Sequence, residues 1–351
     1  MKGSGPTMAI DGVRRATIDD VARLANVHKA TVSRALNAAT RHQVSAATVE
    51  RVELAAAELG YVPNAMARGL RTSSSTTIGV VIPDLTNPFF PPIVRGIENF
   101  LQPRGYTVLL ANTDSSEAIE RTAFESLLGR RVDGLIVASG QQQHQSALAE
   151  VYAAGVKAVM VNRDGGAVPY PLVTGNDASG IAAAVAHLSE LGHRRLLHIA
   201  GPPELSTSAT RTTAFVDACR SIRGVQGDVF EAAALTVEAG QRAMDLVLTE
   251  RRVHPTAVSA SNDLIALGVL RSLRDHGLAC PGDVSVVGFN DITFAEDFWP
   301  PLTTVRVPTH EMGAEAARIL LEGISSGVQE PITVRLPVSL IVRGSTGPAP
   351  S

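Results

Sequence analysis

The chain has 351 residues, a formal net charge of −3, 45% hydrophobic residues and two cysteines, Cys219 and Cys280. This length allows more than one domain, whereas two cysteines are too few for a disulfide framework or a cysteine-rich metal site. The chain lacks both the apolar run of a signal peptide and the roughly 18 apolar residues of a membrane span, so we expect a cytoplasmic protein with no membrane contact, metal or cofactor.

The charge is unevenly distributed along the chain. Residues 1–71 contain ten Lys and Arg against six Asp and Glu, and the remainder has an acidic excess. A basic N-terminal part on an acidic body suits phosphate contact at one end of the molecule, although an ordinary solvated surface would also account for so modest an excess. We expect residues 1–15 to be a disordered extension.

Residues 16–63 predict a small all-α domain. Thr17 and Asp20 form a capping-box-like start for a first helix, in which Val21, Leu24 and Ala25 share one apolar face. A tight turn at 26–27 then leads to a second helix.

The second helix is predicted from about Lys29 to Leu36, with Val32, Ala35 and Leu36 facing the core. Its other face offers groups that can contact phosphates or base edges in a major groove: Lys29, Ala30, Thr31, Ser33, Arg34 and Asn37. Helices joined by a tight turn also occur in ordinary bundles. The basic charge of this part of the chain favours a helix-turn-helix that binds DNA.

Two further segments complete the N-terminal part. Ser45 is expected to cap a third helix over 46–59, which Gly60 ends. Residues 64–70 can form one or two helical turns, and the polar run that follows predicts a linker. We therefore assign residues 64–76 to a hinge helix and linker.

From residue 77 the sequence pattern changes to short Val- and Ile-rich runs separated by amphipathic helical patterns. Continuous apolar strands between helices predict doubly wound parallel sheets, and their number suggests an α/β core of two lobes over 77–344. Ligands of such sheets bind beyond the carboxyl ends of the strands. Residues 345–351 are rich in Pro, Gly and Ser and predict a disordered tail.

These features together resemble the LacI/GalR family of bacterial transcription regulators, over about residues 17–343. The motifs that carry the resemblance are TVSRALN at 31–37, GYVPNAMARGLR at 60–71, DLTNPFF at 84–90, RGIE at 95–98, VDGLIV at 132–137, ASNDLIALG at 260–268 and PGDVSVVGFND at 281–291. The resemblance implies a homodimeric, effector-controlled repressor with a periplasmic-binding-protein-like core, which binds double-stranded operator DNA.

For DNA contact, the resemblance implies base reading by Lys29 and Ala30, with a hinge helix in which Leu70 wedges into the minor groove. The alternative is that Leu70 forms the apolar face of a short helix. The full set of implied DNA-binding residues is Thr17, Ile18, His28, Lys29, Ala30, Thr31, Ser33, Arg34, Asn37, Ser45, Asn64, Ala67 and Leu70. His28 departs from the Ser usual in the family, which leaves open a weaker turn or a pH-sensitive phosphate contact.

For the effector, the resemblance implies a sugar, sugar derivative or nucleoside between the lobes. The implied contacts are Asn87, Phe89, Phe90, Asn162, Arg163, Arg211, Asn262 and Asn290. Core packing is the alternative for Phe90, and a solvated helix start is the alternative for Arg211. Asn162 and Asn290 replace the Asp that sugar-binding relatives often have, so less negative charge is expected in this pocket.

Enzymatic alternatives find little support in the sequence. The spacing of His187, His193 and His198 does not place them on one helix face as metal ligands, and we find no HExxH or Walker motif. We expect no enzyme. The remaining rival is a stand-alone sugar-binding protein of a transport system, which the basic N-terminal part disfavours.

Overall fold

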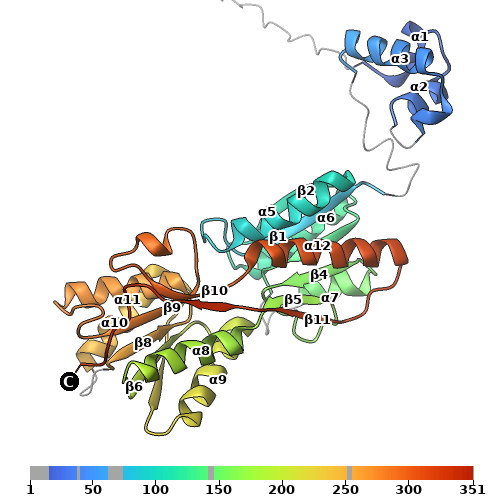
Figure 1. The fold of residues 1–351 in the computed structure, drawn as a ribbon. Helices are drawn as coiled ribbons and strands as arrows, with labels where there is room; N and C mark the ends of the chain where they lie inside the picture. Colours follow the sequence, from blue (N-terminus) through green and yellow to red (C-terminus); the bar gives the residue numbers. More distant parts are fainter. Residues whose placement is uncertain (1–15, 38–39, 62–73, 141–145, 251–254, 351) are drawn as a thin grey trace, which may run out of the picture. The chain divides into compact units, whose positions relative to one another are not determined.

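The structure is a computed structural model that describes residues 16–37, 40–61, 74–140, 146–250 and 255–350. The chain forms two compact units, residues 1–75 and 76–351, which are labelled in Figure 1 and are described separately below. The predicted extension over 1–15 lies outside the described residues, as do Asn64, Ala67 and Leu70 of the predicted hinge helix.

The first unit is a small bundle of the helices α1 (Ile18–Leu24), α2 (Lys29–Ala35) and α3 (Ala46–Glu58), with a 3₁₀ turn, η1, at Arg41–Gln43. Val21, Val32 and Val52 are fully buried at its centre. The capping box is confirmed: the Thr17 hydroxyl accepts from the Asp20 amide, and the Asp20 carboxylate accepts from the Thr17 amide at 2.9 Å. Each of these contacts satisfies an amide that the helix start would leave unpaired.

Two details of this unit differ from the sequence prediction. Leu24 is 46% exposed and Ala22 is buried, so the inward face of α1 consists of Val21, Ala22 and Ala25, at i, i+1 and i+4. Ser45 stands at the start of α3, but its hydroxyl donates to Thr48 Oγ1 at 2.9 Å and accepts no backbone amide.

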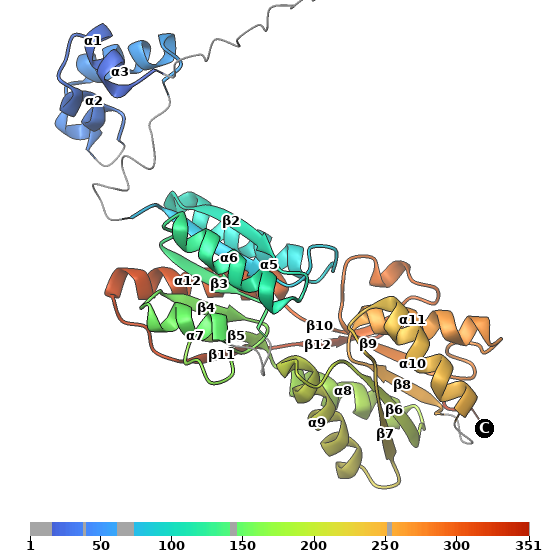
Figure 2. The same cartoon turned by 180° about the vertical axis from the view of Figure 1, so that it is seen from behind.

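The N-terminal lobe of the second unit is built on a six-stranded parallel sheet in the order β11-β5-β4-β3-β1-β2. Its strands are β1 (Thr77–Ile82), β2 (Thr107–Asn112), β3 (Gly134–Val137), β4 (Ala158–Val161), β5 (Leu172–Gly175) and β11 (Thr333–Leu336). The helices α5 (Phe90–Leu101, followed by η2 at Gln102–Arg104) and α12 (Thr309–Ser326) cover one face, and α6 (Glu117–Gly129) and α7 (Ser146–Ala153) cover the other (Figure 2).

The C-terminal lobe repeats this plan with the strand order β12-β10-β9-β8-β6-β7. Its strands are β6 (Arg195–Ala200), β7 (Gln226–Glu231), β8 (Ala257–Ala260), β9 (Ser285–Asn290), β10 (Thr303–Arg306) and the antiparallel edge strand β12 (Ser339–Ile341). Its helices are α8 (Asp177–Glu190), α9 (Ser206–Ser221), α10 (Val237–Glu250) and α11 (Asp263–Asp275), with η3 at Ala295–Asp297. The chain passes between the lobes after β5, β10 and β11, so the predicted two-lobed, doubly wound core is confirmed.

Glycines allow helices to approach closely in both lobes. A Cβ on Gly96 of α5 would collide with the His310 carbonyl oxygen, and one on Gly313 of α12 would collide with that of Ile93. Gly240 and Gly268 make the same close approach between α10 and α11. These backbone-to-backbone contacts explain why glycine occurs inside helices, where it otherwise costs stability.

The prediction of a disordered tail is wrong for residues 345–350. Ser345 is fully buried, and its hydroxyl donates to the Val286 carbonyl at 2.7 Å while it accepts the Thr303 amide at 2.8 Å. The Ala349 amide donates to the Leu191 carbonyl at 2.8 Å. Hydrogen bonds to the lobe hold this segment, and a composition rich in Pro, Gly and Ser gives no sign of them. Among the described helices, none combines the length and apolarity needed to cross a membrane.

Candidate functional site

The predicted DNA-reading face lies on α2. Val32 and Ala35 point into the bundle, and the side chains of Lys29, Ala30 and Arg34 are exposed. Of the other predicted DNA contacts, Thr17, His28 and Ser45 are exposed, and Ile18, Thr31, Ser33 and Asn37 are half-buried. The fold of this unit therefore leaves the donors of α2 accessible to a ligand.

His28, which stands where the family usually has Ser, is the N-cap residue of α2. Its Nδ1 accepts a hydrogen bond from the Ala30 amide at 3.2 Å. An imidazole can accept at Nδ1 only when that nitrogen carries no proton, so neutral His28 substitutes for the hydroxyl cap. The turn is thus capped.

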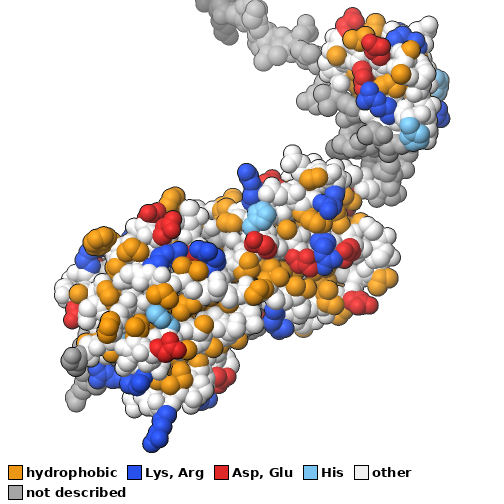
Figure 3. All heavy atoms as spheres, in the orientation of Figure 1, with side chains coloured by type: hydrophobic (Ala, Val, Ile, Leu, Met, Phe, Trp, Pro, Cys, Tyr) orange, Lys and Arg blue, Asp and Glu red, His pale blue; other side chains and the backbone are white. Residues whose placement is uncertain are grey.

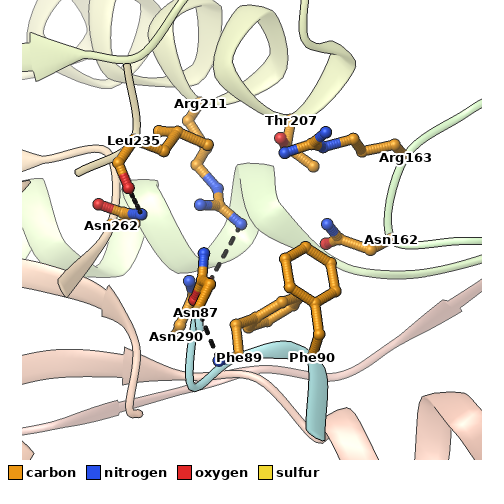
Figure 4. Close-up of a pocket in the computed structure, with 10 residues that line it drawn as sticks. All are labelled: Asn87, Phe89, Phe90, Asn162, Arg163, Thr207, Arg211, Leu235, Asn262 and Asn290. Carbon is orange, nitrogen blue, oxygen red and sulfur yellow. Dashed lines mark hydrogen bonds between the residues drawn. The ribbon is translucent and has the colours of Figure 1, made fainter. Parts of the chain in front are cut away.

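A pocket of about 280 Å³ lies between the two lobes of the core. Its lining consists of Asn87, Phe89, Phe90, Asn162, Arg163, Thr207, Arg211, Leu235, Asn262 and Asn290 (Figure 4). All eight residues predicted as effector contacts belong to this lining.

The strand ends explain how these residues meet. In the N-terminal lobe, Asn87, Phe89 and Phe90 follow β1, and Asn162 and Arg163 follow β4. In the C-terminal lobe, Asn262 follows β8 and Asn290 is the last residue of β9. Helix α9 contributes Thr207 and Arg211. The carboxyl ends of both parallel sheets therefore border one cleft, as expected for open α/β sheets.

The sequence prediction missed Thr207 and Leu235. Thr207 lies four residues before Arg211 on α9, and that spacing places both on one helix face, so it could have been found. Leu235 lies between β7 and α10 in a stretch of small and apolar residues that carries no such signal.

Arg211 is buried, and its positive charge is compensated by the carboxylate of Asp177. Its Nε donates to Asp177 Oδ2 at 2.8 Å, its Nη1 to the Ser261 carbonyl at 2.6 Å, and its Nη2 to Asn290 Oδ1 at 3.4 Å. The guanidinium also lies 3.9 Å from the ring centroid of Phe289. The sequence predicted Arg211 as an effector contact and gave no indication of its carboxylate partner.

Arg163 is equally buried, at 5% exposure, yet its Nε and Nη1 have no hydrogen-bond partner. Burial, followed by repulsion from the neighbouring Arg211, lowers the pKa of its guanidinium to about 10. Glu120 acts in the opposite direction. Figure 4 shows the Arg163 side chain extending across the cleft toward Thr207.

The remaining lining is neutral. Phe89 and Phe90 meet edge to face, with centroids 5.3 Å apart, and Phe90 both packs in the core and faces the pocket. Asn162 and Asn290 have φ angles of +68° and +118°, a region in which asparagine is enriched. Asn262 caps α11 by accepting from the Ile265 amide at 2.8 Å.

The histidines that the sequence considered as metal ligands do not converge. His193 contacts Thr256 and Ser285, whereas His198 stacks on Phe215 inside the core. Within the described part of the chain, no group of three or more His, Cys, Asp or Glu side chains is arranged to hold a metal ion.

A helix-turn-helix unit joined to a two-lobed core with a polar interlobe pocket defines the class of ligand-responsive DNA-binding regulators. A family model for bacterial regulatory proteins of the lacI family matches residues 17–64, and one for a periplasmic binding protein-like domain matches residues 185–346.

Full-length relatives agree. The transcriptional repressor CytR of Escherichia coli K12 is 35% identical over 337 residues, which cover 95% of this chain and 97% of CytR. The lac repressor dimer bound to operator superposes with a TM-score of 0.83 at 30% identity, covering 95% of this chain and all of that one. The complex of the regulator CelR with cellobiose superposes with a TM-score of 0.71 at 34% identity, covering 94% of this chain and 100% of that one.

The chain belongs to the LacI family of bacterial transcription regulators, and it is a ligand-responsive repressor. The predicted resemblance is confirmed. The rival interpretation, a stand-alone sugar-binding protein, is not supported, because the match to repressors extends through the helix-turn-helix unit as well as the core.

Proposed function

We propose that this protein acts as a homodimer in the cytoplasm, associated with the nucleoid when bound to DNA, and that it has no catalytic activity. Two helix-turn-helix units read half-sites of a roughly palindromic operator. The observation that carries the proposal is the polar interlobe pocket on a chain whose α2 leaves Lys29 and Arg34 exposed. Charged side chains of both signs are interspersed on the face of the core drawn in Figure 3.

On DNA, Lys29 and Ala30 read base edges, with Arg34 as a bidentate donor to guanine. Contacts to the DNA backbone or to base edges come from the remaining exposed or half-buried positions: Thr17, Ile18, His28, Thr31, Ser33, Asn37 and Ser45. The segment 64–70, with Asn64 and Ala67, forms the hinge helix, and Leu70 unstacks the central base step. Unstacking costs a few kcal/mol, which the contacts of the bent complex offset.

The effector is a sugar, a sugar derivative or a nucleoside held in the interlobe pocket by Asn87, Phe89, Phe90, Asn162, Arg163, Arg211, Asn262 and Asn290. The cellobiose complex of CelR supports a sugar. Because both lobes contribute to the lining, ligand binding favours lobe closure. The ligand then shifts DNA affinity by its differential affinity for the two states.

A gel-shift titration with genomic fragments near this gene tests the proposal. We expect a salt-dependent shift, because neutralised phosphates release counterions, and a change in that shift with one metabolite of the class named above. If no fragment shifts at any salt concentration, with or without metabolites, the proposal is wrong.

The wedge role of Leu70 needs a separate variant. Leu70→Ala should weaken operator binding and reduce DNA bending, measured by circular permutation gel assays, without changing metabolite affinity. Leu246→Ala removes a similar side chain, 43% exposed on α10, and serves as the control that should change neither. Unchanged bending in Leu70→Ala would remove the wedge from the proposal.

A further inference from the structure

The two buried arginines of the interlobe pocket differ in what compensates their charge. All three nitrogens of Arg211 donate to protein acceptors, one of them an Asp177 oxygen at 2.8 Å. Arg163 has two buried nitrogens without any acceptor. A buried donor that lacks a partner is costly, and a charged one costs more than a neutral one. The protein retains this cost at a position where a ligand can remove it.

No other acidic group in the pocket compensates Arg163. The ten lining residues include four asparagines and two arginines and no Asp or Glu. The carboxylate that influences Arg163 most is Glu120, which is buried and accepts a hydrogen bond from Ser139 Oγ at 2.6 Å. Burial raises the pKa of Glu120, and its carboxylate is already engaged by Ser139.

The position of Arg163 also indicates which part of the ligand would carry the group that binds it. Arg163, Asn87, Phe90 and Leu235 line both this inner pocket and an adjoining hollow. Acidic side chains, Asp84 and Glu204, line only the adjoining hollow. An anionic group is therefore favoured on the inner side, against Arg163, and the neutral part of the ligand lies along the asparagines and the phenyl rings.

From this asymmetry we propose that the effector is an anion, whose carboxylate or phosphate group binds the unpaired Nε and Nη1 of Arg163. This inference rests on the proposed function, because it specifies the chemical class of the ligand of the same pocket. It distinguishes sugar acids, sugar phosphates and nucleotides from the neutral sugars and nucleosides that the pocket would otherwise suit.

The first test uses inorganic sulfate as a probe and melting temperature as the measurement. The full chain, Arg163→Gln and the control Arg220→Gln are melted in sodium sulfate and in sodium chloride of equal ionic strength. Arg220 also lies on α9, but its side chain is 78% exposed. Sulfate should raise the melting temperature of the wild type and Arg220→Gln by at least about 2 °C more than that of Arg163→Gln. Equal rises in all three proteins would overturn the proposal.

The second test compares matched ligands by calorimetry: D-glucose with D-glucuronate and D-glucose 6-phosphate, and adenosine with adenosine 5′-monophosphate. Where a set binds, the charged member should bind at least tenfold tighter to the wild type, and Arg163→Gln should lose most of that preference. The carboxylate and phosphate members show which anion is preferred. A neutral member that binds more tightly, with an affinity unchanged in Arg163→Gln, would refute the proposal.

Failure of this inference is distinguishable from failure of the proposed function. If Arg163→Gln still shifts operator fragments and still responds to a neutral metabolite, the regulator stands and the anionic effector is wrong. If the wild type shifts no fragment, the proposed function fails whatever its pocket binds.

Discussion

Removal of the carboxylate that compensates Arg211 should be among the most damaging single changes in the core. Asp177 and Arg211 have side chains only 5% and 4% exposed, and their charged atoms are 2.8 Å apart. Asp177→Ala would leave a cation buried with only neutral acceptors. Breaking a buried ion pair from one side costs about 3–5 kcal/mol, a large part of the 5–15 kcal/mol that is typical for whole domains.

Urea unfolding followed by circular dichroism measures this cost in the full chain. Asp217→Ala is the matched control, since Asp217 faces Arg220 at 4.0 Å on α9 with both side chains largely exposed, and it should cost less than about 1 kcal/mol. The double variant Asp177→Ala/Arg211→Met should recover much of the loss, because no charge is then left buried. A cost for Asp177→Ala as small as that of the control would refute the reasoning.

Three further changes test other parts of the molecule. Thr17→Ala should destabilise the N-terminal unit by about 1 kcal/mol in thermal melts, and more than Ser45→Ala, whose hydroxyl accepts no backbone amide. Gly313→Ala should cost at least about 1–3 kcal/mol in urea unfolding through overpacking, whereas Gly129→Ala, in open space, should cost none. Burial lowers the pKa of His198 to about 4. The neutral histidine therefore contributes up to roughly 3 kcal/mol to the free energy of unfolding above pH ~6.5, and this contribution is lost as the pH falls toward 4. His198→Phe should flatten that part of the stability–pH profile.

The features that the sequence predicted well depend on periodicity and order along the chain. Continuous Val- and Ile-rich runs between helices are sufficient for parallel sheets, and parallel sheets place their carboxyl ends at one edge. That is why Asn87 after β1, Asn162 after β4 and Asn290 at the end of β9, far apart in sequence, line one pocket.

Features that depend on pairing in space were not predictable in this way. Nothing in the sequence spacing joins Asp177 to Arg211, because the contact depends on how α8 packs on α9. The outward position of Leu24 and the docking of residues 345–350 likewise depend on distances between elements. The composition of residues 345–350 is typical of loops, and composition does not show whether the folded lobe offers hydrogen-bond acceptors for the backbone of such a segment.

The two strand-end asparagines connect backbone geometry to the charge of the pocket. Asn162 and Asn290 both have positive φ, and asparagine and aspartate are both enriched in that region. The backbone alone therefore does not decide between them, and charge is what distinguishes the two side chains. A carboxylate at Asn290, whose Oδ1 lies 3.4 Å from Arg211 Nη2, or at Asn162 would partly neutralise the pair of buried guanidiniums. With amides at both positions the pocket keeps its positive charge, and Arg163 remains without an acceptor until a ligand supplies one.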